Sequence, residues 1–265
     1  LARALGRRAQ DEDHVLDLAI QAYVIDGQTR NNGGGVYRVR IGCDGALTNE
    51  GLVAAARSPA DLGFLPDGRV IVGAKDILDS ATGDAHLMTW NGTPAVVAST
   101  TPFSDADAIL SDIAVVGAGS HVLLADNGLL STNRVGVVEV AGDTLVARQE
   151  IALDDPVALV ASPWGNAVLA VSGYSDAFFA LDYDVANATA PVTLLGQLTY
   201  AGVRPQLPGG AVLIESGTLR GRVLVAENLG IRQVQFADTG AITDRGLGWS
   251  ATGTQNIVGT LGVTP

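Results

Sequence analysis

The stretch Arg222–Phe236, RVLVAENLGIRQVQF, decides the fold of this chain. An apolar run comes first, a polar break follows, and apolar and polar residues then alternate. The stretch His121–Val140, HVLLADNGLLSTNRVGVVEV, repeats this pattern. A continuous Val/Leu run is typical of a strand buried on both faces, and alternation is typical of a strand with one buried face. Each stretch therefore predicts two adjacent antiparallel strands.

Strand pairs of this kind recur along the whole chain. They are expected at Gln21–Asp26 with Val36–Ile41, Arg69–Gly73 with Ala85–Trp90, His121–Asp126 with Arg134–Val140, Ala167–Ser172 with Ala177–Tyr183, and Arg222–Glu227 with Ile231–Phe236. The first strands of successive pairs are expected to end at Asp26, Ala74, Asp126, Ser172 and Glu227, that is 48, 52, 46 and 55 residues apart, which leaves room for four strands in each interval. A small antiparallel sheet that recurs at such a spacing predicts an all-β fold, the β-propeller.

Further runs flank these pairs. An apolar run that ends in a turn precedes four of them, at Leu62–Leu65, Ile113–Val116, Val157–Ala161 and Ala211–Ile214. A more polar run follows each pair, at Leu52–Ala56, Ala95–Ser99, Leu145–Ile151, Val192–Leu198 and Ala241–Gly246. We expect the apolar runs to form the innermost strands of the blades and the polar runs to form their exposed outer edges.

The first pair has no innermost strand of its own before it. Near the other end of the chain, Asn256–Val263 is an apolar run without a partner. We therefore expect this C-terminal run to complete the N-terminal blade and close the ring. This count gives five blades in a single domain of residues 1–265, and six remain open if residues 1–20 and 248–265 contribute more than one closing strand.

The charge of the chain restricts its partners. Sixteen basic and 28 acidic residues give a net charge of −12, which argues against nucleic acid and favours cationic ligands or basic protein surfaces. No apolar run is long enough to span a bilayer. Cys43 is the single cysteine, so the chain has no internal disulfide and no cysteine-based metal site. We expect an exported protein, secreted, periplasmic or at the cell surface.

Two blades carry a recognisable motif. The segments LLADNG…NRVGVVEV and LVAENLGIRQVQF, with the hairpin Leu65–Val72, LPDGRVIV, resemble blades of the NHL-repeat and gluconolactonase-like propeller superfamily. The resemblance implies a propeller fold. In the lactonase branch, acidic and Asn side chains at the centre of one face hold a divalent cation. The usual opening of that branch, a Glu beside Gly-Pro, has no counterpart in this chain.

Acidic residues fall at equivalent ends of the predicted strands. Innermost strands begin, and second strands end, on the same face of a propeller, so their terminal residues gather at the mouth of the central channel. The carboxylates expected there are Asp26, Asp61, Asp112, Asp126 and Glu227, with Asn127, Asn228 and Asn256 as neutral oxygen donors. Such oxygens suit Ca²⁺, the cofactor predicted here. The alternative is that these side chains only cap backbone N–H groups at strand ends.

No catalytic residue is assigned. His14, His86 and His121 fall outside the predicted channel mouth, so a Ser-His-Asp arrangement has no natural place. The first functional hypothesis is thus a non-catalytic binding module that recognises a protein, a cell-surface ligand or a cationic small molecule through its channel-mouth loops. The alternative is a divalent-cation-dependent hydrolase of the lactonase type, with Asp26, Asp126 and Glu227 around the ion. A purely structural subunit is a third hypothesis.

Overall fold

A computed structural model of the chain describes residues 20–26, 34–42, 44–55, 59–74, 84–89, 95–104, 108–128, 133–173, 177–199 and 208–250. For residues 20–26, 54–55 and 84 the backbone alone is described. Apart from the 3-10 turn η1 (Gly117–Gly119), the regular elements in these ranges are all strands. The predicted all-β class is therefore confirmed.

The described strands form five antiparallel sheets. The first sheet contains β1 (Ile20–Asp26), β2 (Gly35–Ile41) and β3 (Leu47–Ala55), and the second contains β4 (Pro59–Phe64), β5 (Val70–Ala74), β6 (Asp84–Thr89) and β7 (Ala95–Thr100). The third contains β8 (Leu110–Val116), β9 (His121–Asp126), β10 (Arg134–Ala141) and β11 (Thr144–Ala152), and the fourth contains β12 (Pro156–Ala161), β13 (Ala167–Ser172), β14 (Ala177–Tyr183) and β15 (Val192–Thr199). The fifth contains β16 (Gly210–Leu213), β17 (Arg222–Glu227), β18 (Gly230–Phe236) and β19 (Ile242–Ser250).

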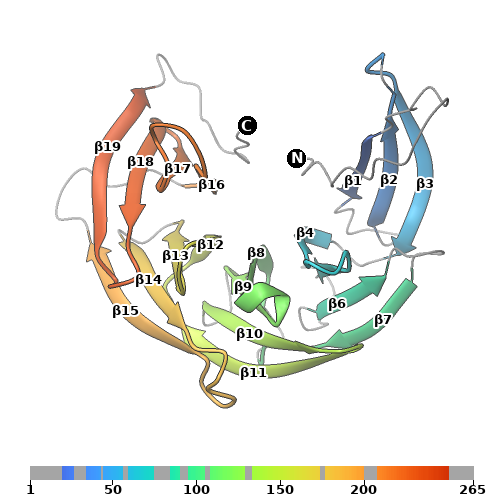
Figure 1. Ribbon diagram of the computed structural model, residues 1–265, viewed down its shortest axis with the longest axis horizontal. Helices are drawn as coiled ribbons and strands as arrows, with labels where there is room; N and C mark the ends of the chain where they lie inside the picture. The colour runs from blue at the N-terminus through green and yellow to red at the C-terminus, as the bar shows by residue number, and fades with distance from the viewer. Residues whose placement is uncertain are drawn as a thin grey trace, which may run out of the picture.

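Within each sheet the spatial order of the strands follows the chain. Figure 1 shows the five sheets set around an arc, with β4, β8, β12 and β16 on its inner side and β7, β11, β15 and β19 on its outer side. The first sheet has three described strands, and β1 corresponds to the second strands of the other sheets, as the sequence predicted. This is the radial architecture of a β-propeller.

Burial follows the position of each strand in its sheet. Every residue of β5, β9 and β13 is buried, whereas the outer strands β7 and β11 hold only exposed and half-buried residues. The Val/Leu-rich runs thus lie inside the molecule and the more polar runs at its rim. Both predictions are confirmed.

Four apolar clusters hold neighbouring sheets together. Along β9, Val122 and Leu124 pack against the β4–β7 sheet, and Leu123 and Ala125 pack against the β12–β15 sheet. Alternate side chains of one strand therefore serve two different interfaces. Burial of such faces is the main favourable contribution to stability in a fold of this kind.

A tight turn joins β4 to β5 at Pro66-Asp67-Gly68. The N–H of Leu65 donates to the carbonyl of Arg69 at 2.9 Å, and the N–H of Gly68 donates to the carbonyl of Leu65 at 3.0 Å. Gly68 has a φ of +87°, a conformation that costs glycine little. The predicted hairpin chemistry is confirmed here.

The predicted closing strand, Asn256–Val263, lies outside the described residues, so ring closure and the blade count stay predictions. In the described part of the chain, no helix is long and apolar enough to cross a membrane.

Candidate functional site: a carboxyl pair on the inner strands

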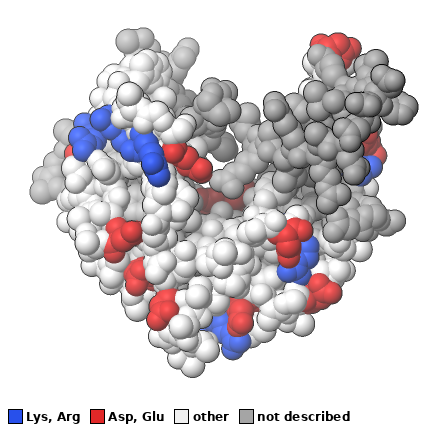
Figure 2. All heavy atoms as spheres, in the orientation of Figure 1, with Lys and Arg blue, Asp and Glu red and all other residues white. Residues whose placement is uncertain are grey.

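The inner strands β4 and β8 carry an aspartate at the same register. Asp61 pairs with Gly73 and Asp112 pairs with Ala125, in each case the last residue but one of the second strand. On β12 and β16 the corresponding positions are Ala158 and Gly210. Two of the four described inner strands therefore place a carboxyl group at this level of the channel. Figure 2 shows acidic atoms set deep at the middle of the arc.

Each carboxyl group is anchored to the next inner strand. The N–H of Ile113 on β8 donates to Oδ2 of Asp61 at 3.0 Å, and the N–H of Leu159 on β12 donates to Oδ2 of Asp112 at 2.6 Å. The two side chains also hydrogen-bond one another. Three successive inner strands are thus linked through the pair, and both carboxyl groups are held in fixed orientations.

The surroundings of the pair favour a bound proton. Burial raises the pKa of Asp112 well above its ordinary value of 3.8, and the charge of Asp61 raises it further. Burial also raises the pKa of Asp61, although its hydrogen bond with Asp112 acts in the opposite direction. Burial is therefore the main reason that the pKa of both carboxyl groups is raised. Both side chains keep some contact with solvent, so a ligand in the channel could reach them.

Asp126 and Glu227, the other described carboxylates of the predicted site, already have partners. Oδ1 of Asp126 accepts from the N–H groups of Ile109 at 2.7 Å and Gly128 at 2.9 Å. Glu227 is fully buried and accepts two hydrogen bonds from Arg232, at 3.0 and 3.2 Å. Asp126 therefore caps backbone N–H groups, as the alternative interpretation holds, and Glu227 forms a buried ion pair.

The remaining predicted site residues are placed only in part. Asp26 is the last residue of β1, where its backbone pairs with Gly35. Asn127 follows β9 and Asn228 follows β17, both half-buried, and Oδ1 of Asn228 is buried without a hydrogen-bond partner in the described part of the chain. Asn256 lies outside the described residues.

Among the described residues, no group of three or more His, Cys, Asp or Glu side chains is arranged to hold a metal ion. The Ca²⁺ site therefore stays a prediction. The His residues agree with the sequence analysis where they are described: His121 starts β9, at the opposite end of the strand from Asp126.

Sequence reasoning missed Asp155, which directly precedes β12. The residue is 5% exposed, its φ is +48°, and its carbonyl accepts from the N–H of Gly173 at 2.8 Å. Non-glycine residues rarely adopt this conformation. The available signal was the Asp-Pro step at the start of an inner strand, since Asp readily forms such turns.

Solved structures of other proteins share the overall fold of this chain. The periplasmic gluconolactonase PpgL of Pseudomonas aeruginosa is similar, with a TM-score of 0.68 and 16% sequence identity over 84% of this chain and 67% of that chain. A putative 6-phosphogluconolactonase of Bacteroides uniformis has a TM-score of 0.67 and 17% identity, over 85% of this chain and 66% of that one. The likeness shows a β-propeller fold. This chain spans about two thirds of the length of these two structures.

The β-propeller fold is compatible with more than one activity. Sqt1 of Chaetomium thermophilum, solved bound to the N-terminus of ribosomal protein L10, has a TM-score of 0.57 and 14% identity, over 87% of this chain and 58% of that chain. At such identities the likeness shows the fold alone. Neither a protein-family model nor a curated protein sequence matches the chain. The superfamily resemblance seen in the sequence is thus confirmed at the level of fold.

Proposed function

We propose that this chain is a binding propeller that takes a cationic group of a protein or small-molecule ligand at its channel mouth. The observation that carries the proposal is the carboxyl pair Asp61–Asp112, two half-buried carboxyl groups on adjacent inner strands whose pKa values are raised by burial. A cation bound there would meet two carboxylates at once, and a proton held by the pair would be released. The net charge of −12 would also raise the local concentration of cationic ligands.

The anchoring of the pair supports this function. Because backbone N–H groups of Ile113 and Leu159 fix the two carboxyl groups, little side-chain freedom remains to be lost on binding. A guanidinium group matches two carboxylates through several donors in fixed geometry, so an arginine-like group is the preferred ligand. The other cation that could bind here is Ca²⁺, for which Asn127 and Asn228 would be further oxygen donors.

The test is isothermal titration calorimetry with agmatine, a small guanidinium compound, and separately with CaCl₂ after chelation. Binding to the wild type should release a proton, so the heat should differ between buffers of different ionisation enthalpy. Asp61→Asn/Asp112→Asn should abolish binding, whereas Asp143→Asn, at an exposed turn, should leave it unchanged. Saturating agmatine at 100 times its Kd would stabilise the fold by about 2.7 kcal/mol. Binding that survives the double substitution would place the site elsewhere.

A second candidate is a divalent-cation-dependent hydrolase of lactones, supported by the shared fold with the gluconolactonase structures and by the raised pKa of Asp112. The Asp61 carboxylate would take a proton from the attacking water, and the Asp112 carboxyl would give its proton to the ring oxygen as the C–O bond breaks. Hydrolysis of glucono-δ-lactone above the spontaneous rate, sensitive to chelation and lost in Asp112→Asn, is the expected result. A rate equal to the spontaneous one would remove this candidate.

The likeness to a periplasmic protein supports the proposal that this chain works outside the cytoplasm. Fusion to a reporter that is active only after export, expressed from the full-length gene, tests this directly.

A further inference from the structure

Trp164 is a large aromatic side chain that stays 44% exposed although its position is fixed. It lies in the hairpin that joins β12 to β13, where its N–H donates to Oγ of Ser162 at 3.3 Å and the N–H of Ser162 donates to the carbonyl of Ala167 at 2.8 Å. The level of the carboxyl pair corresponds to Ala158, near the start of β12. The hairpin lies at the other end of that strand, so Trp164 belongs to a separate part of the surface.

One face of the indole ring of Trp164 is covered by a guanidinium group from the neighbouring sheet. Arg220, in the loop between β16 and β17, lies over the ring, 4.5 Å from its centre. Backbone hydrogen bonds shape this loop, because the N–H of Gly221 donates to the carbonyl of Ile214 at 2.8 Å. The cation–π contact orders the ring. Since Arg220 covers one face, most of the exposed area of Trp164 belongs to the opposite face and to the ring edge.

A carboxylate from a third turn borders the same hairpin. Asp238, in the turn between β18 and β19, occupies the place where a Cβ would stand on Gly165, the residue after Trp164. A larger residue at position 165 would displace this carboxylate, so Gly165 allows its close approach. Leu219, the residue before Arg220, is 37% exposed and adds apolar surface.

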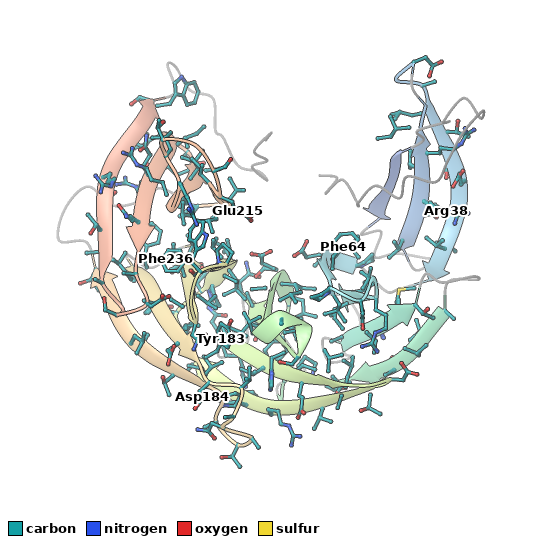
Figure 3. All side chains as sticks on the ribbon, in the orientation of Figure 1. Arg38, Phe64, Tyr183, Asp184, Glu215 and Phe236 are labelled. Carbon is teal, nitrogen blue, oxygen red and sulfur yellow. The ribbon has the colours of Figure 1, made fainter. Side chains whose placement is uncertain are left out.

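The charged groups at this corner have free hydrogen-bonding capacity. Four other carboxylates in turns at this end of the strands accept hydrogen bonds from their own turn or from an arginine: Asp44, Asp67, Asp143 and Asp184. Asp238 and Glu215 accept none from the described residues, and Arg220 forms no ion pair with those residues. Figure 3 shows Glu215 at the loop between β16 and β17, on the inner side of the arc. Donors and acceptors are therefore both available around an exposed ring.

We propose that Trp164, Leu219, Arg220 and Asp238 form a binding site for a neutral pyranose unit of an oligosaccharide. The C–H groups on one face of a pyranose are apolar and stack on an indole ring. Its hydroxyl groups both donate and accept, so they use the guanidinium and the carboxylates together. A polyanion would be repelled by Asp238, Glu215 and the net charge of −12. A quaternary ammonium ligand takes a cage of several aromatic rings, and this site offers one.

The test uses three neutral oligosaccharides, cellohexaose, maltohexaose and β-1,4-galactohexaose. Binding is followed by the tryptophan indole N–H signals in two-dimensional proton–nitrogen NMR spectra and by calorimetry. At least one sugar should shift the Trp164 signal, which is assigned from its absence in Trp164→Ala, and this variant should lose binding. Trp249→Ala removes a similarly exposed tryptophan from β19 and should leave the Kd unchanged.

The carboxylate is tested by a second matched pair of variants. Asp238→Asn should weaken binding roughly tenfold, as expected for loss of a hydrogen bond to a charged group. Asp143→Asn removes the same charge from the exposed turn between β10 and β11 and should bind like the wild type. Thermal melting verifies the fold of each variant, and Asp238→Asn, at an exposed turn, decides the question if Trp164→Ala does not fold.

Four outcomes would overturn the proposal. They are absence of binding to all three sugars, equal weakening by Trp164→Ala and Trp249→Ala, a Trp164 signal that shifts with polygalacturonate alone, and competition between agmatine and the sugar. The third outcome would mean that Arg220 binds an acid. Saturating agmatine should leave the sugar titration unchanged, which tests this site separately from the channel-mouth function.

Discussion

The β8–β11 and β16–β19 sheets are built from the same strand pattern but have different surroundings. In both, the second strand runs from a polar residue through four apolar residues to a carboxylate, in β9 from His121 to Asp126 and in β17 from Arg222 to Glu227. The β8–β11 sheet contributes to apolar clusters on both faces, whereas the described contacts of the β16–β19 sheet place one face in a cluster. The difference shows that one strand pattern serves both an internal sheet and a sheet with a polar face.

The two sheets also share an arrangement of acid, arginine and acid in which the arginine and the acid on the second strand are buried. Arg134 lies between Asp126 and Glu150, with 3.7 Å from its Nε to Oδ2 of Asp126. Arg232 lies between Glu227 and Asp244, with 2.6 Å from Nη1 to Oδ2 of Asp244. In each sheet the arginine stands on the third strand and joins the second strand to the fourth. These groups stabilise the blade and leave their carboxylates little capacity for a ligand.

The largest expected effect comes from breaking the more deeply buried of these arrangements. Glu227→Gln removes the charge that faces the nearly inaccessible Arg232 and should destabilise the fold by about 3 kcal/mol, because it leaves a buried charge partly uncompensated. Asp126→Asn should cost less, since Asn can still accept from Ile109 or Gly128. Urea unfolding measures both. Equal losses would show that the two arrangements are energetically alike.

A core substitution compares the two sheets directly. Leu123 and Leu224 are each the third residue of the second strand, but Leu123 is fully buried between sheets and Leu224 is half-buried. Leu123→Ala should cost about 2–5 kcal/mol through lost burial and a cavity, and Leu224→Ala about 1 kcal/mol. The difference in the free energy of unfolding is the quantity to measure. A large loss for Leu224→Ala would mean that this face of β17 is packed against a further part of the protein in solution.

Much of this fold could be predicted because its signals are local. Val/Leu runs, alternating runs and Gly-containing turns predicted the inner, second, third and outer strands of the described sheets, and the Gly68 hairpin followed from Pro-Asp-Gly. Which face of a strand meets which neighbour could not be predicted, because it depends on contacts far apart in the chain. Leu123 and Leu224 occupy the same position in similar strand patterns, so the sequence does not show that they differ in burial.

The sequence could predict where the carboxyl groups of the candidate site lie along the strands, but not what they contact. The strand pattern predicted that Asp61 and Asp112 start inner strands, whereas their hydrogen bond with each other depends on how closely β4 lies beside β8. Glu227 looked available in sequence because Arg232, which neutralises it, lies on the next strand within an ordinary alternating run. Neighbouring side chains on other strands set the charge state of a carboxylate, and the pattern of apolar and polar residues along one strand does not show which neighbours these are.

The carboxyl pair gives a pH-dependent prediction that distinguishes the acidic part of the channel from the part lined by Ala158 and Gly210. Because the pKa of Asp112 is raised, the folded chain keeps a proton that the unfolded chain releases above its ordinary pKa of 3.8. Stability from this group is therefore lost as the pH rises from about 3.8 toward the raised pKa. Asp112→Asn cannot titrate and keeps groups that bond Leu159 and Asp61, so its Tm should vary less with pH.

Melting curves between about pH 4 and pH 9 measure this difference. At the alkaline end Asp112→Asn should melt at or above the wild type, and Asp143→Asn, exposed and remote from the channel, should follow the wild-type profile. Parallel profiles for Asp112→Asn and the wild type would mean that the pair holds no proton in this range.

The smallest expected effect separates the two kinds of arginine in the β16–β19 sheet. Arg245→Gln removes an exposed group that contacts only the neutral Gln235, so the free energy of unfolding should change by less than about 0.5 kcal/mol. Arg232→Gln, on the opposite face of the same sheet, leaves Glu227 buried without its partner and should be strongly destabilising. Urea unfolding of the two variants gives the contrast. A costly Arg245→Gln would show that Arg245 contributes to packing.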